Sequence, residues 1–240
     1  MLRILACLPL GVLIYRYRLL DLKGTLAATA IAITIVLAAG FSWLGLLLLF
    51  LILGHTSTKY KYSYKAALEV AEGDHGRRSI SNVLANGLVA TLVSLPWYLN
   101  IRGYFPVDLA TPIVAAYIAV IATVTGDTLS SEIGILSDHE PVLITSFQKV
   151  PPGTQGGISL LGEVVGLLGT LTIGLAAWLL GMAGLKVALL SAVVGGAVGF
   201  NFDSLLGAVF ERRQMLGNAG VNFLSTLAGG LVGFRLALAL

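Results

Sequence analysis

Apolar stretches that reach or approach the length of a membrane-spanning helix recur along almost the whole chain. Of the 240 residues, 57% are hydrophobic and only 11% are charged, whereas soluble domains carry roughly a quarter charged residues. A helix needs about 20 mainly apolar residues to cross a bilayer core. The pattern excludes a soluble domain and predicts an all-α, polytopic transmembrane helix bundle, a single integral membrane domain over residues 1–240.

The apolar windows predict seven or eight spans. With eight, the approximate bounds are 2–15, 25–39, 42–57, 80–99, 109–126, 158–180, 185–207 and 218–238. The run 25–53 is too long for one upright helix, and Gly40 lies near its middle, where a bend fits. We therefore expect a short helical hairpin over 25–57. The first window lacks a small-residue cleavage pattern on its far side, so we expect a retained span, not a signal peptide.

The distribution of the 15 Lys and Arg residues favours the hairpin. With it, most of them fall on one side of the membrane, and four lie opposite: Arg3, Arg102, Lys186 and Arg235. Cytoplasmic loops are enriched in Lys and Arg. We expect a cell-membrane protein whose polar loops 58–79 and 127–157 and turn 208–217 face the cytoplasm, together with any site they form.

Four acidic residues lie at or near predicted span ends on that same side: Asp127, Glu132, Glu163 and Asp203. An acid at membrane depth costs roughly 2.5 kcal/mol or more, so it tends to face a cavity, a partner or a site. An acid near a span end can also simply reach the headgroup water, which is the alternative for Glu163 and Asp203 taken singly.

The stretch GDTLSSEIG at 126–134 favours a site. Glycines bracket Asp127 and Glu132, and three hydroxyl residues lie between them. Mg²⁺ takes oxygen ligands and often uses one or two carboxylates together with substrate phosphates. The stretch predicts a magnesium site, with Asp203 and Glu163 as further candidate ligands.

A glycine-rich loop follows at 149–162, KVPPGTQGGISLLG, and contains four residues suited to phosphate: Gly153, Thr154, Gly156 and Gly157. Glycines let backbone amides approach an anion, and a helix start favours negative charge. Lys149 adds a mobile positive charge. The order differs from the GxxxxGK[ST] phosphate loop, and a Pro-Gly turn that caps a helix is the structural alternative.

Two further groups of polar residues lie on the same side. Lys59, Arg77 and Arg78 form a basic region, for which contact with anionic headgroups is the alternative to substrate binding. The pairs Asn82 with Asn86 and Asn218 with Asn222 are spaced i, i+4, so each pair shares a helix face. Interhelical hydrogen bonding is the alternative for these amides.

The order of these motifs resembles the membrane family that includes the phytyl-phosphate kinase of vitamin E synthesis and a widespread transmembrane protein family of animals, archaea and bacteria. The matching stretches span most of the chain: HTSTKYK at 55–61, NVLANG at 82–87, GDTLSSEIG at 126–134, KVPPGTQGGISLLG at 149–162, FDSLLGA at 202–208 and NAGVNFLSTL at 218–227. Dolichol kinases and lipid cytidylyltransferases are distantly similar.

The resemblance implies an NTP-dependent kinase, with CTP as the favoured donor, that phosphorylates a polyprenyl monophosphate to the diphosphate with Mg²⁺. The residues it would use fall into four sets: Asp127, Glu132, Lys149 and Asp203 as catalytic residues; Asp127, Glu132, Asp203 and Glu163 on the metal; Lys149, Gly153, Thr154, Gly156, Gly157, Asn218 and Asn222 on the nucleotide; and Lys59, Arg77, Arg78, Asn82 and Asn86 on the acceptor phosphate.

Two other functions stay open at this point. The same phosphate-binding residues would serve a cytidylyltransferase that makes a CDP-activated lipid. Membrane acids also bind coupling ions in transporters, although the acids here cluster at one boundary. The expected partners are the nucleotide, the lipid and the membrane, with a second copy of the chain as a candidate and no nucleic acid.

Overall fold

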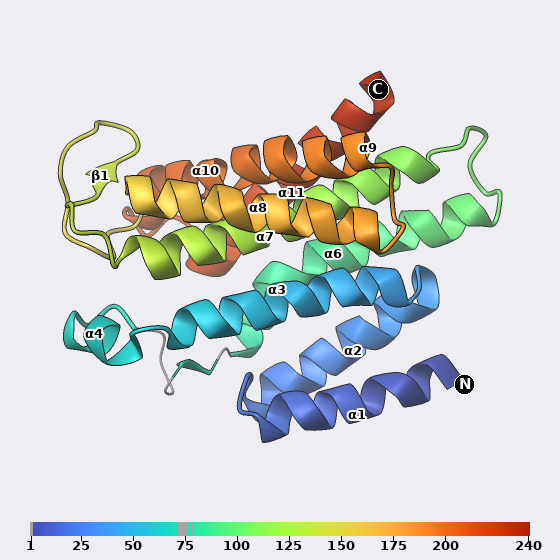
Figure 1. Cartoon of the computed structure of the whole chain (residues 1–240), viewed down its shortest axis with the longest axis horizontal. Coiled ribbons are helices and arrows are strands. Elements are labelled where there is room, and N and C mark those ends of the chain that lie inside the picture. Colours follow the sequence, from blue (N-terminus) through green and yellow to red (C-terminus); the bar gives the residue numbers. More distant parts are fainter. Residues whose placement is uncertain (1, 72–75, 78) are drawn as a thin grey trace.

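The computed structural model describes residues 2–71, 76–77 and 79–240 and shows a bundle of long helices with a small β-hairpin at one end (Figure 1). The elements in chain order are α1 (Leu2–Arg16), α2 (Leu22–Ala38), α3 (Phe41–Lys59), α4 (Tyr62–Ala67), α6 (Ile80–Ile101), α7 (Ala110–Gly134), β1 (Val142–Leu143), β2 (Gly157–Ile158), α8 (Leu160–Leu179), α9 (Leu185–Leu190), the π-helical turn η1 (Ser191–Gly195), α10 (Gly196–Leu206), the π-helical turn η2 (Gly207–Glu211) and α11 (Asn218–Ala239).

Within the described residues, 6 helices are long and apolar enough to cross a membrane. They are α3, α6, α7, α8, α11 and the continuous helix 185–211, which comprises α9, η1, α10 and η2. Helix α2 is a shorter apolar helix, and α1 has 15 residues. The predicted all-α membrane bundle is confirmed. Each predicted window contains a helix, and the two N-terminal helices are shorter than a typical upright span.

The predicted hairpin over 25–57 is present. Helix α2 ends at Ala38 and α3 begins at Phe41. Between them Gly40 adopts φ +100°, a conformation that side-chain-bearing residues rarely adopt. The chain therefore reverses direction inside the longest apolar run, and α2 and α3 become antiparallel neighbours.

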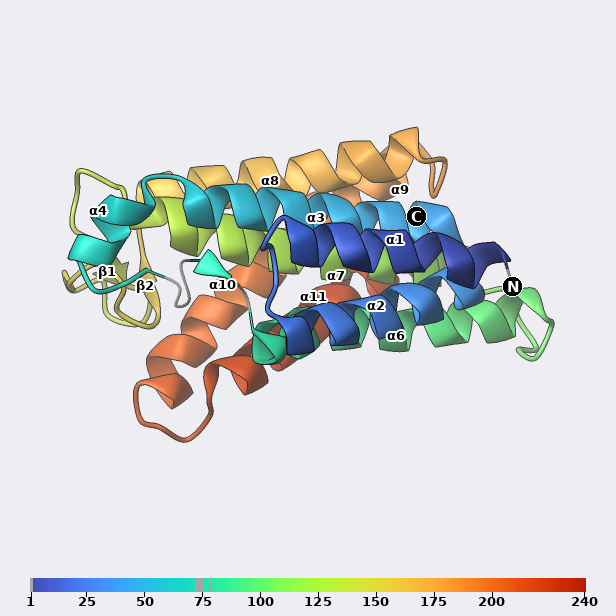
Figure 2. The ribbon, with the colours of Figure 1, turned by 90° about the horizontal axis from the view of Figure 1, so that it is seen from below.

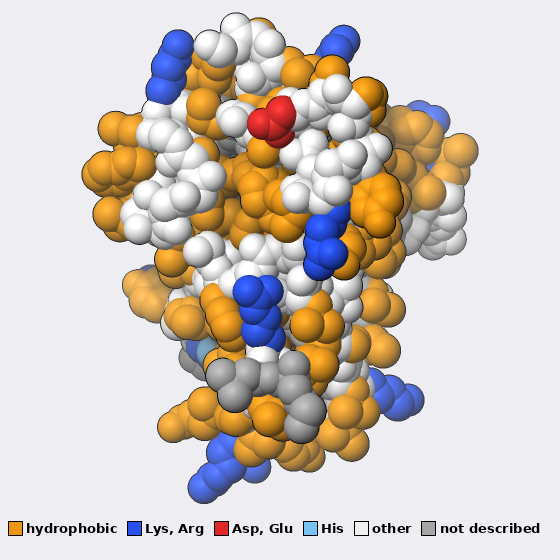
Figure 3. Space-filling view, turned by 90° about the vertical axis from the view of Figure 1, so that its right-hand side faces the viewer, with side chains coloured by type: hydrophobic (Ala, Val, Ile, Leu, Met, Phe, Trp, Pro, Cys, Tyr) orange, Lys and Arg blue, Asp and Glu red, His pale blue; other side chains and the backbone are white. Residues whose placement is uncertain are grey.

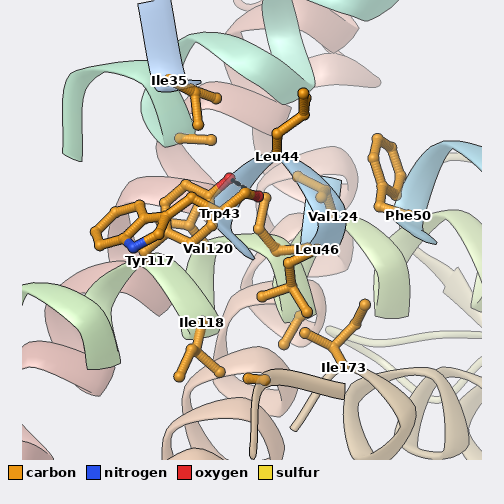
Figure 4. Packing of buried hydrophobic residues seen from close by; sticks show 14 of the residues in the cluster. Ile35, Trp43, Leu44, Leu46, Phe50, Tyr117, Ile118, Val120, Val124 and Ile173 are labelled. Carbon is orange, nitrogen blue, oxygen red and sulfur yellow. Dashed lines mark hydrogen bonds between the residues drawn. The ribbon is translucent and has the colours of Figure 1, made fainter. Parts of the chain in front are cut away.

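Helix α7 forms the centre of the bundle, and almost every side chain from Pro112 to Thr128 is buried. It contacts α3, α6, α8, α10 and α11. Figure 4 shows part of this core, where the Tyr117 hydroxyl donates a hydrogen bond to the Trp43 carbonyl of α3 at 2.7 Å. A helix that is apolar on all sides is buried on all sides, so α7 carries its polar C-terminal turns into the interior of one end.

Glycines allow close packing of the helices around α7. A Cβ at Gly166 would lie 3.1 Å from the Gly126 carbonyl oxygen of α7, and one at Gly195 would lie 3.0 Å from the Gly229 carbonyl oxygen of α11. Small residues at such contacts let backbones approach each other. These glycines allow α8, the helix 185–211 and α11 to pack closely around α7.

The two ends of the bundle differ. Figures 1 and 2 show α4 and the β-hairpin together at one end, with the N-terminus and the α6–α7 connection at the other. The segments that contain most of the Lys and Arg residues lie at the hairpin end, as the charge argument requires. Figure 3 views the opposite end, where hydrophobic side chains predominate and charged ones are scattered singly.

Two boundaries differ from the predictions. Helix α7 continues to Gly134, so GDTLSSEIG forms its last turns, not a loop after a span. Ser130 and Ser131 hydrogen-bond to the carbonyls of Asp127 and Thr128, three residues earlier, which satisfies their hydroxyls within the helix. The predicted loop 127–157 is therefore shorter and contains β1, which pairs antiparallel with β2; α8 starts after β2.

Candidate functional site

A polar pocket of about 490 Å³ opens at the hairpin end. Its walls come from α7, the 152–159 segment, α8, α10, the start of α11 and residues 69–71. Nine residues expected to bind metal or nucleotide line it: Asp127, Glu132, Gly153, Thr154, Gly156, Gly157, Glu163, Asp203 and Asn218. The fold therefore brings together motifs that are far apart in the sequence.

Asp127 of α7 and Asp203 of α10 both line the pocket. Their carboxyl groups lie within hydrogen-bonding contact of each other. Asp203 Oδ2 also accepts a hydrogen bond from the Ser225 hydroxyl of α11 at 2.7 Å. Two carboxylates this close repel each other unless they share a proton or a cation. The pair is thus suited to hold a proton or a metal ion.

Glu132 has a different environment, which the sequence did not indicate. Its Oε2 accepts a hydrogen bond from Lys65 Nζ of α4 at 2.6 Å, and its Oε1 accepts one from the Thr58 hydroxyl at 2.7 Å. The Lys65 side chain is 1% exposed and the Glu132 side chain 14%. Lys65 also donates to the Ser57 carbonyl at 2.9 Å. Glu132 is thus a buried partner of Lys65 at the pocket wall.

The four candidate metal ligands are not gathered into one cluster. Among the described residues, no three His, Cys, Asp or Glu side chains are grouped closely enough to hold a metal. Glu132 pairs with Lys65, and Glu163 Oε2 accepts a hydrogen bond from the Asn201 amide at 3.2 Å. Only the two aspartates are left in mutual contact. Two carboxylates still fit Mg²⁺, which often binds one or two with water and substrate phosphates.

The glycine-rich segment folds over the pocket. Gly153 and Gly156 adopt φ +80° and +76°, which favours glycine at both positions. A Cβ at Gly156 would overlap the Ala208 backbone in η2, so the segment packs directly on the helix that carries Asp203. Ser159 caps α8 by accepting a hydrogen bond from Gly162 N at 3.1 Å. The segment leads through β2 into α8; its binding of phosphate stays a prediction.

Lys149 lies apart from the pocket lining. Its side chain is 76% exposed and pairs with Glu140 at 3.2 Å on the outer side of the hairpin. Lys59 is exposed and lies over the Tyr62 ring at 5.7 Å, and Arg77 is half-buried; neither is among the pocket residues. Arg78 lies outside the described residues. The structure brings the predicted acids and glycines together, but does not place Lys149, Lys59 or Arg77 among the residues that line the pocket.

The asparagines form an adjoining layer. The Asn222 amide of α11 and Asn86 of α6 are 3.3 Å apart. The Asn222 side-chain amide finds hydrogen-bond partners for both its nitrogen and its oxygen when the nitrogen faces Asp203. In that orientation the nitrogen donates to Asp203 Oδ2 at 3.1 Å. Asn82 and Asn86 line a small apolar groove between α1, α2, α3 and α6. The interhelical alternative therefore describes Asn86 and Asn222, which link α6 and α11 beside the acid pair.

Comparison with known families matches residues 5–230 to the pattern of the integral membrane proteins DUF92. The chain belongs to the DUF92 family. This places it among integral membrane proteins and agrees with the helical bundle. No solved structure matches the chain.

Three relatives are similar to this chain over part of their length. An uncharacterized membrane protein of Methanocaldococcus jannaschii is 42% identical over 160 residues, 67% of this chain and 63% of the relative. Protein PGR of Arabidopsis thaliana is 31% identical over 202 residues, 68% of this chain and 70% of PGR. The chloroplastic protein VTE6 of the same plant is 28% identical over 171 residues, 70% of this chain and half of VTE6 (50%).

Proposed function

We propose that the protein is a kinase that transfers phosphate from a nucleoside triphosphate, with CTP as the favoured donor, to a polyprenyl monophosphate of the phytyl or geranylgeranyl type. The observation that carries the proposal is the contact between Asp127 and Asp203 in a pocket that the glycine-rich segment closes. The motif resemblance to the phytyl-phosphate kinase family and the similarity to VTE6 support it.

The charge of the pocket supports a role for a metal ion. Its lining residues include Glu69, Asp127, Glu132, Glu163 and Asp203, and within the described part of the chain no Lys or Arg lines it. A triphosphate alone would meet several like charges there, which is unfavourable. A divalent cation on the two aspartates removes this repulsion, and carboxylate oxygens suit Mg²⁺.

In this proposal the chain binds and orients the reactants. Asp127 and Asp203 would hold the Mg²⁺ ion, which would supply positive charge to offset the negative charge of the donor phosphates. The amides of 153–157 approach the donor phosphates. An oxygen of the acceptor phosphate forms the new bond to the γ-phosphorus, the bond to the bridging oxygen breaks, and the nucleoside diphosphate leaves. The acceptor already carries negative charge, so no side chain needs to remove a proton.

Lys149 is kept as a candidate phosphate contact. It lies on the segment that also carries the glycines, and its exposed ion pair with Glu140 costs at most about 1 kcal/mol to break. Glu132 does not need to bind metal in this scheme. Held by Lys65, it fixes the last turns of α7 and thereby the position of Asp127.

The test uses purified protein in lipid nanodiscs with Mg²⁺, each nucleoside triphosphate in turn and geranylgeranyl or phytyl monophosphate. The expected product is the prenyl diphosphate, detected by mass spectrometry. We expect Asp127→Asn and Asp203→Asn to lower turnover by at least about 100-fold, in line with the loss of a group that stabilises transition-state charge. Asp138→Asn is the matched control, because Asp138 is exposed in the same region and does not line the pocket.

Full activity in Asp127→Asn, or the absence of prenyl diphosphate with every donor, would remove the kinase assignment. Lys149→Ala tests the separate role of that lysine. Unchanged turnover in this variant would restrict phosphate binding to the backbone loop and the metal ion.

The second candidate is a cytidylyltransferase, because the same pocket accommodates a triphosphate. It would release pyrophosphate and incorporate the nucleotide into the lipid, so the fate of radiolabelled CTP separates the two. The position of the acids argues against a transporter. All four line a pocket at one end of the bundle, whereas the coupling-ion sites of carriers lie near the membrane midplane.

The cytoplasmic position of the pocket is also a proposal, based on the excess of Lys and Arg at the hairpin end. In a Cys7→Ser background, Arg213→Cys should resist a membrane-impermeant maleimide added to intact cells, and Lys186→Cys should react. The reverse pattern would place the pocket on the outer side.

A further inference from the structure

A second cavity, of about 360 Å³, lies between α6, α7 and α11, and all of its lining residues are apolar. Its floor is buried: Val89, Ile113 and Val120 are at most 4% exposed. Its rim is open, with Leu92 47% and Leu231 57% exposed. These helices are membrane spans, so the cavity is an apolar groove that opens sideways toward lipid. Its volume is within the range of about 300–1,000 Å³ found for ligand sites.

The groove is hollow where small residues face it. Ala116 of α7 contributes little side-chain volume, and Pro96 stands inside α6. Gly230 of α11 also lines the groove but packs against α7, since a Cβ there would lie 2.8 Å from the Val120 side chain. Protein interiors are normally close-packed, with few voids larger than a water molecule. A groove of this size between apolar helices is large enough to accommodate a hydrocarbon chain.

One end of the groove meets the polar site. Val89 lies one helical turn from Asn86 on α6, and Phe223 follows Asn222 on α11. These two asparagines approach each other at 3.3 Å across the helices, and Asn222 faces Asp203. An amphiphile with its chain in the groove would thus carry its polar end to the Asn86–Asn222 layer and, beyond it, to the acid pair.

We propose that this groove binds the hydrocarbon chain of the isoprenoid phosphate, with its phosphate beside Asn86 and Asn222 and within reach of a cation on Asp203. The proposal rests on the proposed kinase function for the identity of the ligand. In this proposal, Asn86 and Asn222 contact the phosphate of the acceptor lipid. The groove then determines which length of isoprenoid chain the protein accepts.

The groove between α1, α2, α3 and α6 is the rival location, because Asn86 also lines it. Its volume is about 70 Å³, too small for a long isoprenoid chain without movement of its helices. The larger groove needs no such movement. The two locations share the asparagine and differ in the helices that would contact the chain.

Photolabelling of the unaltered protein separates the two grooves. Geranylgeranyl monophosphate with a diazirine near the end of its chain is incorporated with the protein into nanodiscs, and labelled peptides are mapped by mass spectrometry. We expect labels on α6 and α11, including Leu92 and Leu231, and competition by unlabelled geranylgeranyl monophosphate. Labels confined to α1, α2 and α3, or labels that this competitor does not reduce, would overturn the proposal.

Matched filling variants test the same point. Ala116→Phe fills the proposed groove, and Ala28→Phe fills the rival one. Ala116→Phe should reduce photolabelling and weaken binding of the geranylgeranyl compound relative to the geranyl compound by about tenfold, the equivalent of about two buried methylene groups. The assignment would be contradicted if Ala28→Phe changed that binding ratio as much as Ala116→Phe, or if Ala28→Phe changed it and Ala116→Phe did not.

The readouts also distinguish failure of this proposal from failure of the kinase assignment. Labelling of α6 and α11 without any diphosphate product would retain the lipid groove and reject the kinase. Diphosphate production with labelling in the α1–α3 groove would retain the kinase and reject this groove.

Discussion

The buried ion pair between Lys65 and Glu132 yields the sharpest stability prediction. Among the described residues of α4, Lys65 contacts Glu132 on α7. Its Nζ donates hydrogen bonds to the Glu132 carboxylate (2.6 Å) and to the Ser57 carbonyl (2.9 Å). Replacing it by Met keeps most of the side-chain volume but removes the charge. Among the described residues, Glu132 would then keep only the Thr58 hydroxyl as a hydrogen-bond partner for a largely buried carboxylate.

Removal of one partner of a buried ion pair typically costs about 3 to 5 kcal/mol, because the remaining charge is buried without compensation. For a chain of this size, that corresponds to a fall in melting temperature of about 6 to 20 °C. The double variant Lys65→Met/Glu132→Gln leaves no buried charge. It should recover a large part of the loss, since the two sites are in direct contact and their effects are not additive.

Thermal unfolding in detergent, followed by intrinsic tryptophan fluorescence, measures these changes. Lys149→Met is the matched control: it also breaks a Lys–Glu pair, but an exposed one, for which about 0 to 1 kcal/mol is expected. If Lys65→Met and Lys149→Met lowered the melting temperature equally, or if the double variant were no more stable than Lys65→Met alone, the structural role given to Lys65 would be refuted.

Two further predictions use other parts of the fold. A Cβ at Gly199 would overlap the Thr123 side chain, so Gly199→Ala should cost about 1 to 3 kcal/mol; Gly184→Ala, with nothing within 4 Å, should not lower the melting temperature. Hydrogen bonds from Asn100 and the backbone of the α7 start hold the pKa of Asp108 below its ordinary value. Asp108 therefore stabilises the fold above that ordinary pKa and loses this effect as pH falls through the lowered one. The difference in melting temperature between wild type and Asp108→Asn should shrink below about pH 4, and a constant difference would contradict this.

The helices could be predicted because each has a local cause. Apolar windows mark the membrane-buried segments whatever their neighbours are, and Gly40 marks the reversal between α2 and α3 because glycine readily adopts its φ of +100°. The position of the acids at one end also followed from chain direction alone, because successive spans alternate between the two sides of the membrane.

The continuation of α7 through GDTLSSEIG could not be predicted in this way. Hydropathy falls at Asp127, so a window ends the span there, whereas the helix continues because its polar side chains find partners in neighbouring elements. Asp127 meets Asp203, and Glu132 meets Lys65 and Thr58. Tertiary contacts of this kind override the local signal.

The choice between the lysines shows where sequence reasoning stops in this family. Lys149 stands beside glycines, and the motif suggested a phosphate contact; Lys65 stands in a basic, tyrosine-rich stretch, and the sequence analysis gave it no specific role. In the folded chain Lys149 is exposed on the hairpin, and Lys65 is buried against the end of α7. The burial of Lys65 depends on the packing of α4 against the end of α7, between residues that are 67 positions apart in the sequence. No local sequence pattern encodes this contact. Within the described part of the chain, no Lys or Arg lines the pocket, and the proposed chemistry therefore places a divalent cation with the aspartates.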